Sequence, residues 1–276
     1  MIFYKMQGAG NDYLYIDAIS QSLPKGFVEE IPRLCHPHYG IGADGVILLT
    51  EGIGADIGMK MWNKDGSLGK MCGNGIRCLA RLSHDLGYTE GEMTISTDGG
   101  VRHIALYKNK EGIVTGAEVE MGRPDFTPKA VPHLGDSPNL RMYFAGMERG
   151  FTALSMGNPH MTTFVDNLEQ IPEKDGNALT KNPLFPEGVN VGVGMVTGKD
   201  ALALRVFERG SGETLACGTG ACAAVAVGTQ KGYFVRGKPV TVRMAGGTLT
   251  VTQHYDASIS LYGDCQYICK GEWYEF

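Results

Sequence analysis

The sequence predicts an α+β fold of two pseudo-symmetric domains, each built mainly of antiparallel strands around a central helix. Three observations support this prediction. Short strand-like segments dominate the 276-residue chain, one strong helical segment occurs in each half, and both halves carry the same motifs in the same order. Strands and helices that do not alternate regularly along the chain are typical of the α+β class.

An internal repeat relates the two halves. The segment MCGNGIRC at residues 71–78 resembles ACGTGAC at 216–222, so that Cys72 and Cys217 correspond at an offset of 145 positions. Four features recur in the same order, and this period is too long for a solenoid repeat, so we expect two similar domains. The other recurring features are Gly10-Asn11 with Gly157-Asn158, the strand ends Asn63 with Glu208, and the Gly-Gly pairs at 99–100 with 246–247.

The domain boundary is expected where glycine and proline interrupt the strand pattern, at Gly122, Pro124 and Pro128. We therefore assign residues 1–118 to an N-terminal half that carries Cys72. Residues 119–263 form a C-terminal half that carries Cys217.

The individual elements follow from local patterns. Strands are expected where alternating apolar residues lie between turn residues. Helices are expected at 76–86, where an apolar stripe recurs at helical spacing, and at 221–230, which is apolar all round and therefore buried. The expected strands are 13–18, 45–50, 57–63, 93–96, 102–107, 114–120, 151–156, 161–165, 201–208, 240–244, 248–254 and 257–262.

Composition excludes several classes of function. The net charge is −5 and no long basic run occurs, which argues against nucleic acid or an anionic membrane as a partner. No apolar stretch approaches the length needed to span a bilayer, and the N-terminus lacks a signal-peptide pattern. We therefore expect a cytoplasmic protein that acts on a small molecule.

The chain has seven cysteines, and their spacing favours neither a disulfide framework nor a zinc site. Cys35, Cys265 and Cys269 are expected to be small buried hydrophobic residues. Cys78 and Cys222, which fall inside the two predicted helices, are expected to pack there. No metal-ligand cluster and no lysine motif for a pyridoxal cofactor is evident, so we expect neither a metal nor a cofactor.

Cys72 and Cys217 each precede a predicted helix, and this position favours proton transfer by their thiols. The first turn of a helix has backbone N–H groups without internal partners, and its dipole favours negative charge. A cysteine there can lose its proton near neutral pH, and a carboxylate can bind to the same N–H groups. Two such cysteines on opposite faces of an amino acid would remove and return the Cα proton and so invert the stereocentre.

Several motifs closely resemble the diaminopimelate epimerase family, from the N-terminus to about Gly271. The two cysteine motifs together are highly specific, whereas the isolated asparagine matches are weak on their own. The matching segments are KMQGAGND at 5–12, GIGADG at 40–45, WNKDGS at 62–67, MCGNGIRC at 71–78, SMGNPH at 155–160, ERGSGET at 208–214 and ACGTGAC at 216–222.

The resemblance implies conversion of LL-2,6-diaminopimelate into the meso form, in lysine biosynthesis, by a cofactor-independent isomerase. It also implies a homodimer and a last strand, at about 264–276, that returns to the first domain. The reacting pair would be Cys72 and Cys217. The residues implied in substrate binding are Gly73, Asn74, Gly218 and Thr219 at the reacting carboxylate, with Asn11, Asn63, Asn158, Asn190, Glu208 and Arg209 as further contacts.

The chemistry of these residue types agrees with a substrate that has two amino-acid heads. Arg209 can bind a carboxylate with two parallel hydrogen bonds, and the asparagines can fix orientation. Asn63, Asn158 and Asn190 also lie beside turn residues, so a purely local role in turns is the alternative. His160 is either a group that positions a catalytic residue or a structural histidine.

Some positions depart from common forms of the family. Gly45 stands where certain members have glutamine, which removes one side-chain contact. Lys70 and the pair Asp264-Cys265 also differ, and none of these positions belongs to the proton-transfer pair.

Three alternatives stay open at this point. The same machinery could act on another amino acid, as in a histidine racemase. A dinucleotide-binding oxidoreductase is suggested by GTGACA at 218–223, but no acidic residue follows at the spacing that this fingerprint requires. A binding protein with an inactive site would lack exchange of the Cα proton with solvent.

Overall fold

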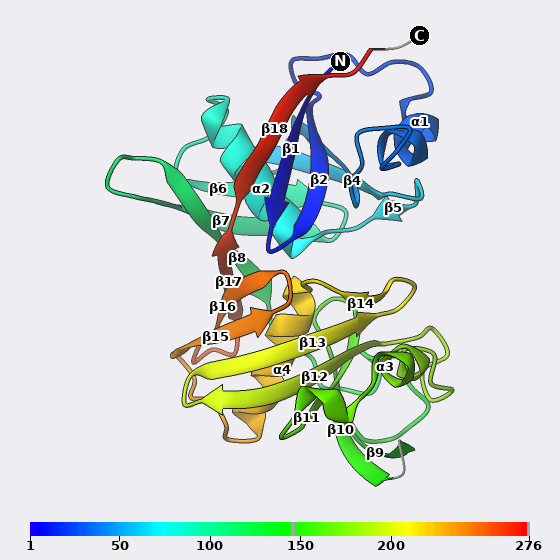
Figure 1. Cartoon of the computed structure of the whole chain (residues 1–276). Helices are drawn as coiled ribbons and strands as arrows, with labels where there is room; N and C mark the ends of the chain where they lie inside the picture. Colours follow the sequence, from blue (N-terminus) through cyan, green and yellow to red (C-terminus); the bar gives the residue numbers. More distant parts are fainter. Residues whose placement is uncertain (145–146, 275–276) are drawn as a thin grey trace. The chain divides into compact units, whose positions relative to one another are not determined.

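The computed structural model describes residues 1–144 and 147–274, which form an α+β fold with mostly antiparallel strands (Figure 1). The described chain divides into two compact units. The first unit is Met1–Val119 together with the chain from Tyr262, and the second is Glu120–Leu261. The chain leaves the first unit within strand β8 (Val114–Gly122) and returns to it within β17 (Ile259–Asp264).

The first unit places a central helix, α2, against the strands that surround it. Helix α2 contacts β1, β2, β3, β4 and β7. The bounds of the remaining elements of this unit are β1 (Ile2–Gly8), β2 (Asn11–Asp17), α1 (Phe27–Leu34), β3 (Gly45–Glu51), β4 (Ile57–Asn63), β5 (Leu68–Gly69), α2 (Gly73–Asp85), β6 (Glu92–Thr97), β7 (Gly100–Lys108) and β18 (Gln266–Glu272).

The second unit is arranged in the same way around α4, which contacts β10, β11, β12, β13 and β16. In Figure 1, β12 and β13 run side by side with α4 against them. The elements of this unit are β9 (Asn139–Phe144), β10 (Met147–Ser155), β11 (Pro159–Phe164), a 3₁₀ helix (Leu168–Gln170), α3 (Glu173–Leu179), β12 (Asn190–Gly198), β13 (Ala201–Glu208), β14 (Gly212–Thr214), α4 (Gly218–Gln230), β15 (Pro239–Met244) and β16 (Gly247–Gln253).

The pairing of the strands shows that the two units share one topology. In each unit a hairpin, β1–β2 or β10–β11, is followed by a parallel partner, β3 or β12. A second parallel pair encloses each central helix, β4 with β6 around α2 and β13 with β15 around α4. The registers also correspond, since Leu14 pairs with Val46 in the first unit and Met161 with Val191 in the second.

Both central helices are buried because small residues let them approach the strands closely. A side chain at Gly75 would come within 2.5 Å of Ile47, and one at Gly220 within 2.9 Å of Val206. Burial of α4 follows from its composition, since its alanines and valines leave no polar face.

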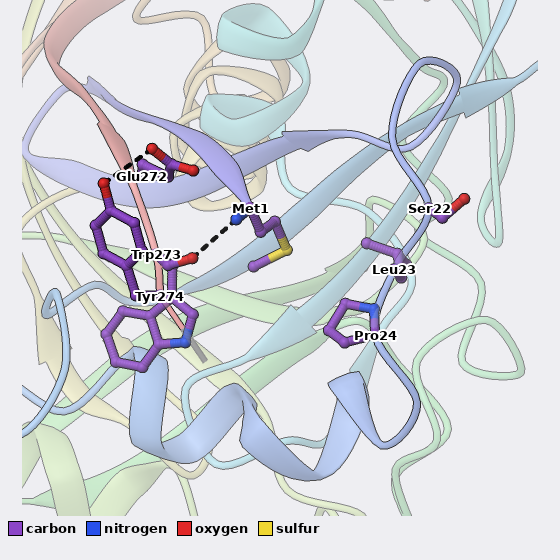
Figure 2. A pocket seen from close by; sticks show the side chains of 7 residues that line it. All are labelled: Met1, Ser22, Leu23, Pro24, Glu272, Trp273 and Tyr274. Carbon is purple, nitrogen blue, oxygen red and sulfur yellow. Dashed lines mark hydrogen bonds between the residues drawn. The ribbon is translucent and has the colours of Figure 1, made fainter. Parts of the chain in front are cut away.

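The strand β18 pairs with β1, so the last described strand of the chain lies beside the first. This pairing continues to the terminus, where the amino group of Met1 donates to the carbonyl oxygen of Trp273 at 2.8 Å. Figure 2 shows that contact beside a shallow pocket lined by Met1, Ser22, Leu23, Pro24, Glu272, Trp273 and Tyr274.

The structure confirms the predicted fold class and both predicted central helices, although each helix begins three residues earlier than predicted. Two short helices were not predicted. Pro32 inside α1 and Gly176 inside α3 both argue against a helix in the sequence. Tertiary packing explains both helices, since α1 buries Phe27, Ile31 and Leu34, and a side chain at Gly176 would collide with Phe207. Among the described helices, none is long and apolar enough to cross a membrane.

We expect Leu79→Ala, in the middle of α2, to lower the free energy of unfolding by about 2–5 kcal/mol. Leu79 is fully buried, so truncation leaves a cavity among the strands that surround the helix. Urea denaturation followed by circular dichroism would measure the loss. Leu134→Ala is the matched control, because Leu134 is 72% exposed and should change stability by less than about 0.5 kcal/mol.

Candidate functional site

Two cysteines occupy the same structural position, one in each unit. Cys72 is the N-cap residue of α2 and Cys217 is the N-cap residue of α4. Their backbone angles are nearly equal, with φ −128° and ψ 122° at Cys72 and φ −130° and ψ 111° at Cys217, and each helix is 13 residues long. The repeat in the sequence therefore corresponds to a repeated local structure, in which a thiol lies at the positive end of a buried helix dipole.

The sulfur of Cys72 lies within hydrogen-bonding distance of the helix and of the β1–β2 hairpin. It accepts a hydrogen bond from the backbone N–H of Gly75 at 3.4 Å and donates to Asn11 Oδ1 at 3.3 Å. Asn11 follows the Ala9-Gly10 turn, in which both residues have positive φ, as a two-residue hairpin turn requires. The turn thus fixes the position of Asn11 beside the cysteine.

A chain of hydrogen bonds sets the orientation of the two asparagine side chains at Cys72. Arg77 Nη2 donates to Asn74 Oδ1 at 3.0 Å, Asn74 Nδ2 lies 3.5 Å from Asn11 Oδ1, and Asn11 Nδ2 donates to Asp44 Oδ2 at 2.7 Å. A guanidinium can only donate and a carboxylate can only accept, so both amide orientations are determined. We call Asn11, Cys72 and Asn74, with the end residues Asp44 and Arg77, the first cysteine site.

Arg77 is completely buried, and the described partners of its guanidinium are oxygen atoms of uncharged groups. It donates to the carbonyl oxygens of Gly73 and Asp264 and to the side chain of Asn74. Its positive charge therefore lies at the start of α2, where it adds to the potential of the helix dipole. The corresponding position in α4 is Cys222.

In the second unit, the sulfur of Cys217 lies 3.6 Å from Thr219 Oγ1. Thr219 in turn accepts a hydrogen bond from Asn158 Nδ2 at 3.4 Å, and His160 Nε2 lies 3.0 Å from Asn158 Oδ1 and 3.1 Å from Thr219 Oγ1. We call Asn158, His160, Cys217 and Thr219 the second cysteine site. It corresponds to the first, since Asn158 is the last residue of the β10–β11 turn and Asn11 is the first residue after the β1–β2 turn.

His160 is buried and uncharged. Burial, in the first place, and the positive charge of Arg209 lower the pKa of His160 from 6.5 to about 3. A neutral imidazole has one donor and one acceptor nitrogen, and its tautomer decides whether Nε2 donates to Asn158 and Thr219 or accepts from Thr219.

The other predicted residues of the second unit lie at the ends of β12 and β13. Asn190 is buried, and its Oδ1 accepts from the backbone N–H of Arg209 at 3.0 Å. Arg209 Nη1 donates to the carbonyl oxygen of Glu187 at 2.9 Å, and Glu208 Oε1 accepts from Thr214 Oγ1 at 2.7 Å.

Asn63 lies at the corresponding end of β4 in the first unit. Its side chain donates to Ser67 Oγ at 2.9 Å across the turn to β5, and Asn63 pairs with Gly45 in the β3–β4 register. The local role in a turn that the sequence left open for Asn63 is therefore present in the structure.

Two residues of the first cysteine site were not selected from the sequence: Asp44 and Arg77. The repeat holds no signal for them, since their role depends on the hydrogen-bond chain that only the folded unit creates.

The family model described as diaminopimelate epimerase matches residues 3–127 and 152–268. The chain belongs to the diaminopimelate epimerase family. A diaminopimelate epimerase of Geobacillus kaustophilus is 39% identical over 99% of this chain and 96% of its own length. One of Leptospira biflexa is also 39% identical, over 98% of both chains.

Solved structures with low sequence identity share the fold. A Bacillus anthracis phenazine biosynthesis protein of the PhzF family has a TM-score of 0.71 at 18% identity, with coverage of 100% of this chain and 99% of its own. A probable proline racemase from Agrobacterium radiobacter has a TM-score of 0.71 at 14% identity, with coverage of 100% and 93%. The diaminopimelate epimerase family thus shares its architecture with proteins of other names.

The remaining cysteines differ from the two N-cap cysteines in their surroundings. Burial raises the pKa of Cys35 and of Cys265 to about 11 and that of Cys78 to about 12, so these three stay protonated at neutral pH. Cys269 was expected to be buried, and this expectation is wrong, because Cys269 lies exposed on β18. Within residues 1–144 and 147–274, no group of three or more metal-ligating side chains occurs.

We expect the neutral His160 to make the protein lose stability in acid. The folded pKa lies below the unfolded value, so the unfolded state binds the extra proton first. The contribution of the neutral His160 to the free energy of unfolding is complete above pH 6.5. It is lost as the pH falls toward 3, by at most about 1.4 kcal/mol per pH unit. Urea unfolding at pH 7.5 and at pH 5 gives the free energy of unfolding at each pH. The difference between these two free energies should be smaller for His160→Gln than for the wild type. Equal differences would contradict the prediction.

Proposed function

We propose that this protein is a diaminopimelate epimerase, which interconverts LL-2,6-diaminopimelate and meso-diaminopimelate by transfer of a Cα proton between Cys72 and Cys217. The observation that carries the proposal is the pair of N-cap cysteines with matching backbone conformation in two units of matching topology. Full-length relatives named diaminopimelate epimerase support the substrate.

Inversion at a carbon requires an acid and a base on opposite faces of that carbon. One thiolate takes the Cα proton, and the electron pair left behind is delocalised into the adjacent carboxylate. The thiol of the other cysteine then gives its proton to the opposite face, and this thiol becomes the thiolate. Since the reverse reaction exchanges the two roles, both positions need the same residue type, which is consistent with the repeat.

The first turns of α2 and α4 supply groups that stabilise the negative charge. The backbone N–H groups of Gly73 and Asn74 in one helix, and of Gly218 and Thr219 in the other, belong to the turn that lacks internal partners. We propose that the carboxylate at the reacting centre binds to these groups. Charge that develops on this carboxylate then meets dipoles that are already oriented, which lowers the barrier.

The second amino-acid head of the substrate needs its own contacts. We propose that Arg209 binds the distant carboxylate and that Glu208 accepts hydrogen bonds from the distant ammonium group. Asn11, Asn63, Asn158 and Asn190 would orient the substrate. Arg209 is an exposed residue, with the carbonyl oxygen of Glu187 as the described partner of Nη1, which leaves further guanidinium donors for a ligand.

The two thiols supply the acid and the base, and the helix N-termini stabilise the carboxylate, so we infer that the reaction requires neither a cofactor nor a metal. The reaction belongs to lysine biosynthesis, and we place the protein in the cytoplasm as a homodimer, as the family resemblance implies. Sedimentation velocity at micromolar concentration tests the dimer, and a single monomeric species would contradict it.

The decisive test of the function is exchange of the Cα proton in deuterium oxide. With LL-diaminopimelate as the substrate, we expect deuterium at Cα and formation of the meso isomer. A panel of other L-amino acids, with histidine included, should show neither. Turnover of another amino acid without turnover of diaminopimelate would overturn the substrate, and binding without exchange would indicate an inactive site.

Cys72→Ala and Cys217→Ala should each lower kcat for epimerisation by at least about 100-fold, the usual scale for loss of a general acid or base. Chiral chromatography of the product measures the loss, and circular dichroism verifies the fold. Cys269→Ala is the control, because this exposed thiol lies on β18 outside either cysteine site. Near-normal turnover in either N-cap variant would refute the two-base assignment.

Arg209→Met should raise KM for diaminopimelate by about 10- to 100-fold, because a hydrogen-bonded ion pair to the distant carboxylate is lost. The value of kcat should change less, since this contact is present in both the ground state and the transition state. Arg141→Met, at an exposed arginine paired with Glu148, is the control. An unchanged KM in Arg209→Met would remove Arg209 from the substrate site.

A further inference from the structure

Arg209 is an exposed residue, yet the structure holds it at three points. Its backbone N–H donates to Asn190 Oδ1 at 3.0 Å, and its Nη1 donates to the carbonyl oxygen of Glu187 at 2.9 Å. Between these points the side chain passes Gly188, where a Cβ atom would lie 3.6 Å from Arg209 Cβ and 3.7 Å from Arg209 Cδ. The contacts thus involve the backbone, the aliphatic stem and the guanidinium of one side chain.

Two of these contacts come from a tight turn, Phe185–Gly188, with the sequence Phe-Pro-Glu-Gly. The backbone N–H of Gly188 donates to the carbonyl oxygen of Phe185 at 2.9 Å, which closes the turn. Pro186 occupies the second position, where its fixed φ is favoured, and Gly188 occupies the fourth position with φ +74°. The carbonyl group of Glu187 that binds Arg209 therefore belongs to a backbone with little conformational freedom.

The turn is anchored in the second unit. Phe185 and Val189 are buried in the same hydrophobic cluster, and the backbone N–H of Val189 donates at 3.0 Å to the carbonyl oxygen of Thr180, the C-cap residue of α3. A Cβ atom at Gly188 would lie 3.1 Å from that carbonyl oxygen. Gly188 thus fits between Thr180 and the stem of Arg209, and a side chain there would displace one of them.

The hydrogen bond to Glu187 leaves the guanidinium of Arg209 able to bind a carboxylate. Among the contacts of the described residues it occupies Nη1, whereas Nε and Nη2 lie parallel on one edge and match the two oxygens of a carboxylate. A long side chain that is already ordered loses less conformational entropy when its ligand binds. A turn that orders Arg209 therefore increases the affinity for a carboxylate without touching it.

We propose that Gly188 is a positioning residue for substrate binding, which holds Arg209 in the conformation that receives the distant carboxylate of a substrate with two amino-acid heads. The Phe185–Gly188 turn then favours such substrates over amino acids with a single head. This inference rests on the proposed function, in which Arg209 binds the distant carboxylate.

The internal repeat supports a role in binding rather than in the fold. At the offset of 145 positions, Gly188 corresponds to Ala43 and Arg209 corresponds to Lys64. A feature that the shared topology required would be expected in both units. The substrate has one distant head, so one such arrangement is sufficient.

The test is the steady-state kinetics of Gly188→Ala with LL-diaminopimelate. The methyl group would crowd the carbonyl oxygen of Thr180, and alanine disfavours φ +74°, so we expect the turn to shift and to release Arg209. Ordering one long side chain on binding corresponds to a rise in KM of about 2- to 13-fold. The value of kcat should change less, since the contact is present in both the ground state and the transition state.

A double variant separates this effect from general damage to the fold. When Arg209→Met is already present, Gly188→Ala should raise KM no further, because no guanidinium remains to be positioned. An equal rise in KM in the presence and absence of Arg209→Met would overturn the proposal.

Gly112→Ala is the matched control, because Gly112 ends a turn of the same form. Gly112 follows a glutamate, has φ +80°, and its backbone N–H donates to the carbonyl oxygen of Asn109 at 3.0 Å. No atom of the described residues lies within 4 Å of a Cβ placed there, so KM should not change. If circular dichroism shows that Gly188→Ala does not fold, Pro186→Ala, at an exposed position of the turn, replaces it and should raise KM by about twofold.

The order of the Arg209 side chain is measured without turnover, by ¹⁵N relaxation of the arginine Nε–H groups in the full-length protein without substrate. The order parameter of Arg209 should exceed about 0.6 in the wild type and in Gly112→Ala and fall below this value in Gly188→Ala. The proposal is overturned if this order parameter does not fall, or if KM is unchanged in the turn variant. A fall in the order parameter, together with a wild type that does not turn over diaminopimelate, would support the role of the turn and overturn the function, so the two failures are distinguishable.

Discussion

The structure of both units depends on one constraint, that the start of a buried helix must find partners for its free N–H groups. An N-cap side chain usually satisfies one of them, and serine, threonine, aspartate and asparagine are the common choices. Here the N-cap residues are cysteines, and the sulfur of Cys72 accepts the N–H of Gly75 as a cap would. In the proposed mechanism this cap also transfers a proton, which joins the stability of the helix to the chemistry of the site.

This arrangement requires close packing around each helix. Gly75 and Gly220 occupy equivalent positions three residues after the N-cap, and a side chain at either would collide with a strand residue. The glycines lower the intrinsic helix propensity of these segments. Burial of the helices among the strands offsets that loss, and the helix ends are in this way fixed against the hairpins that carry Asn11 and Asn158.

The two units are equal in backbone and unequal in the groups around the sulfur. The first cysteine site has Asn74 and a buried arginine, whereas the second has His160 and Thr219 with Cys222 in place of the arginine. The two faces of one Cα present its substituents in different arrangements, so unequal sites are compatible with equal proton-transfer residues. The repeat preserves a cysteine at the N-cap of each central helix, and the side chains around the two cysteines differ.

The sequence alone predicted the fold class and the central helices and singled out Cys72 and Cys217, because these depend on local periodicity and on a repeat visible in the residue order. Only the tertiary structure decided the orientation of Asn11 and the burial of Arg77 at the start of α2. Cys269, expected to be buried, shows the same limit, since its exposure depends on which elements pack against β18 in the folded chain. Hydrogen-bond direction and burial arise from residues distant in the chain, such as Asp44 with Asn11, and no local pattern records them.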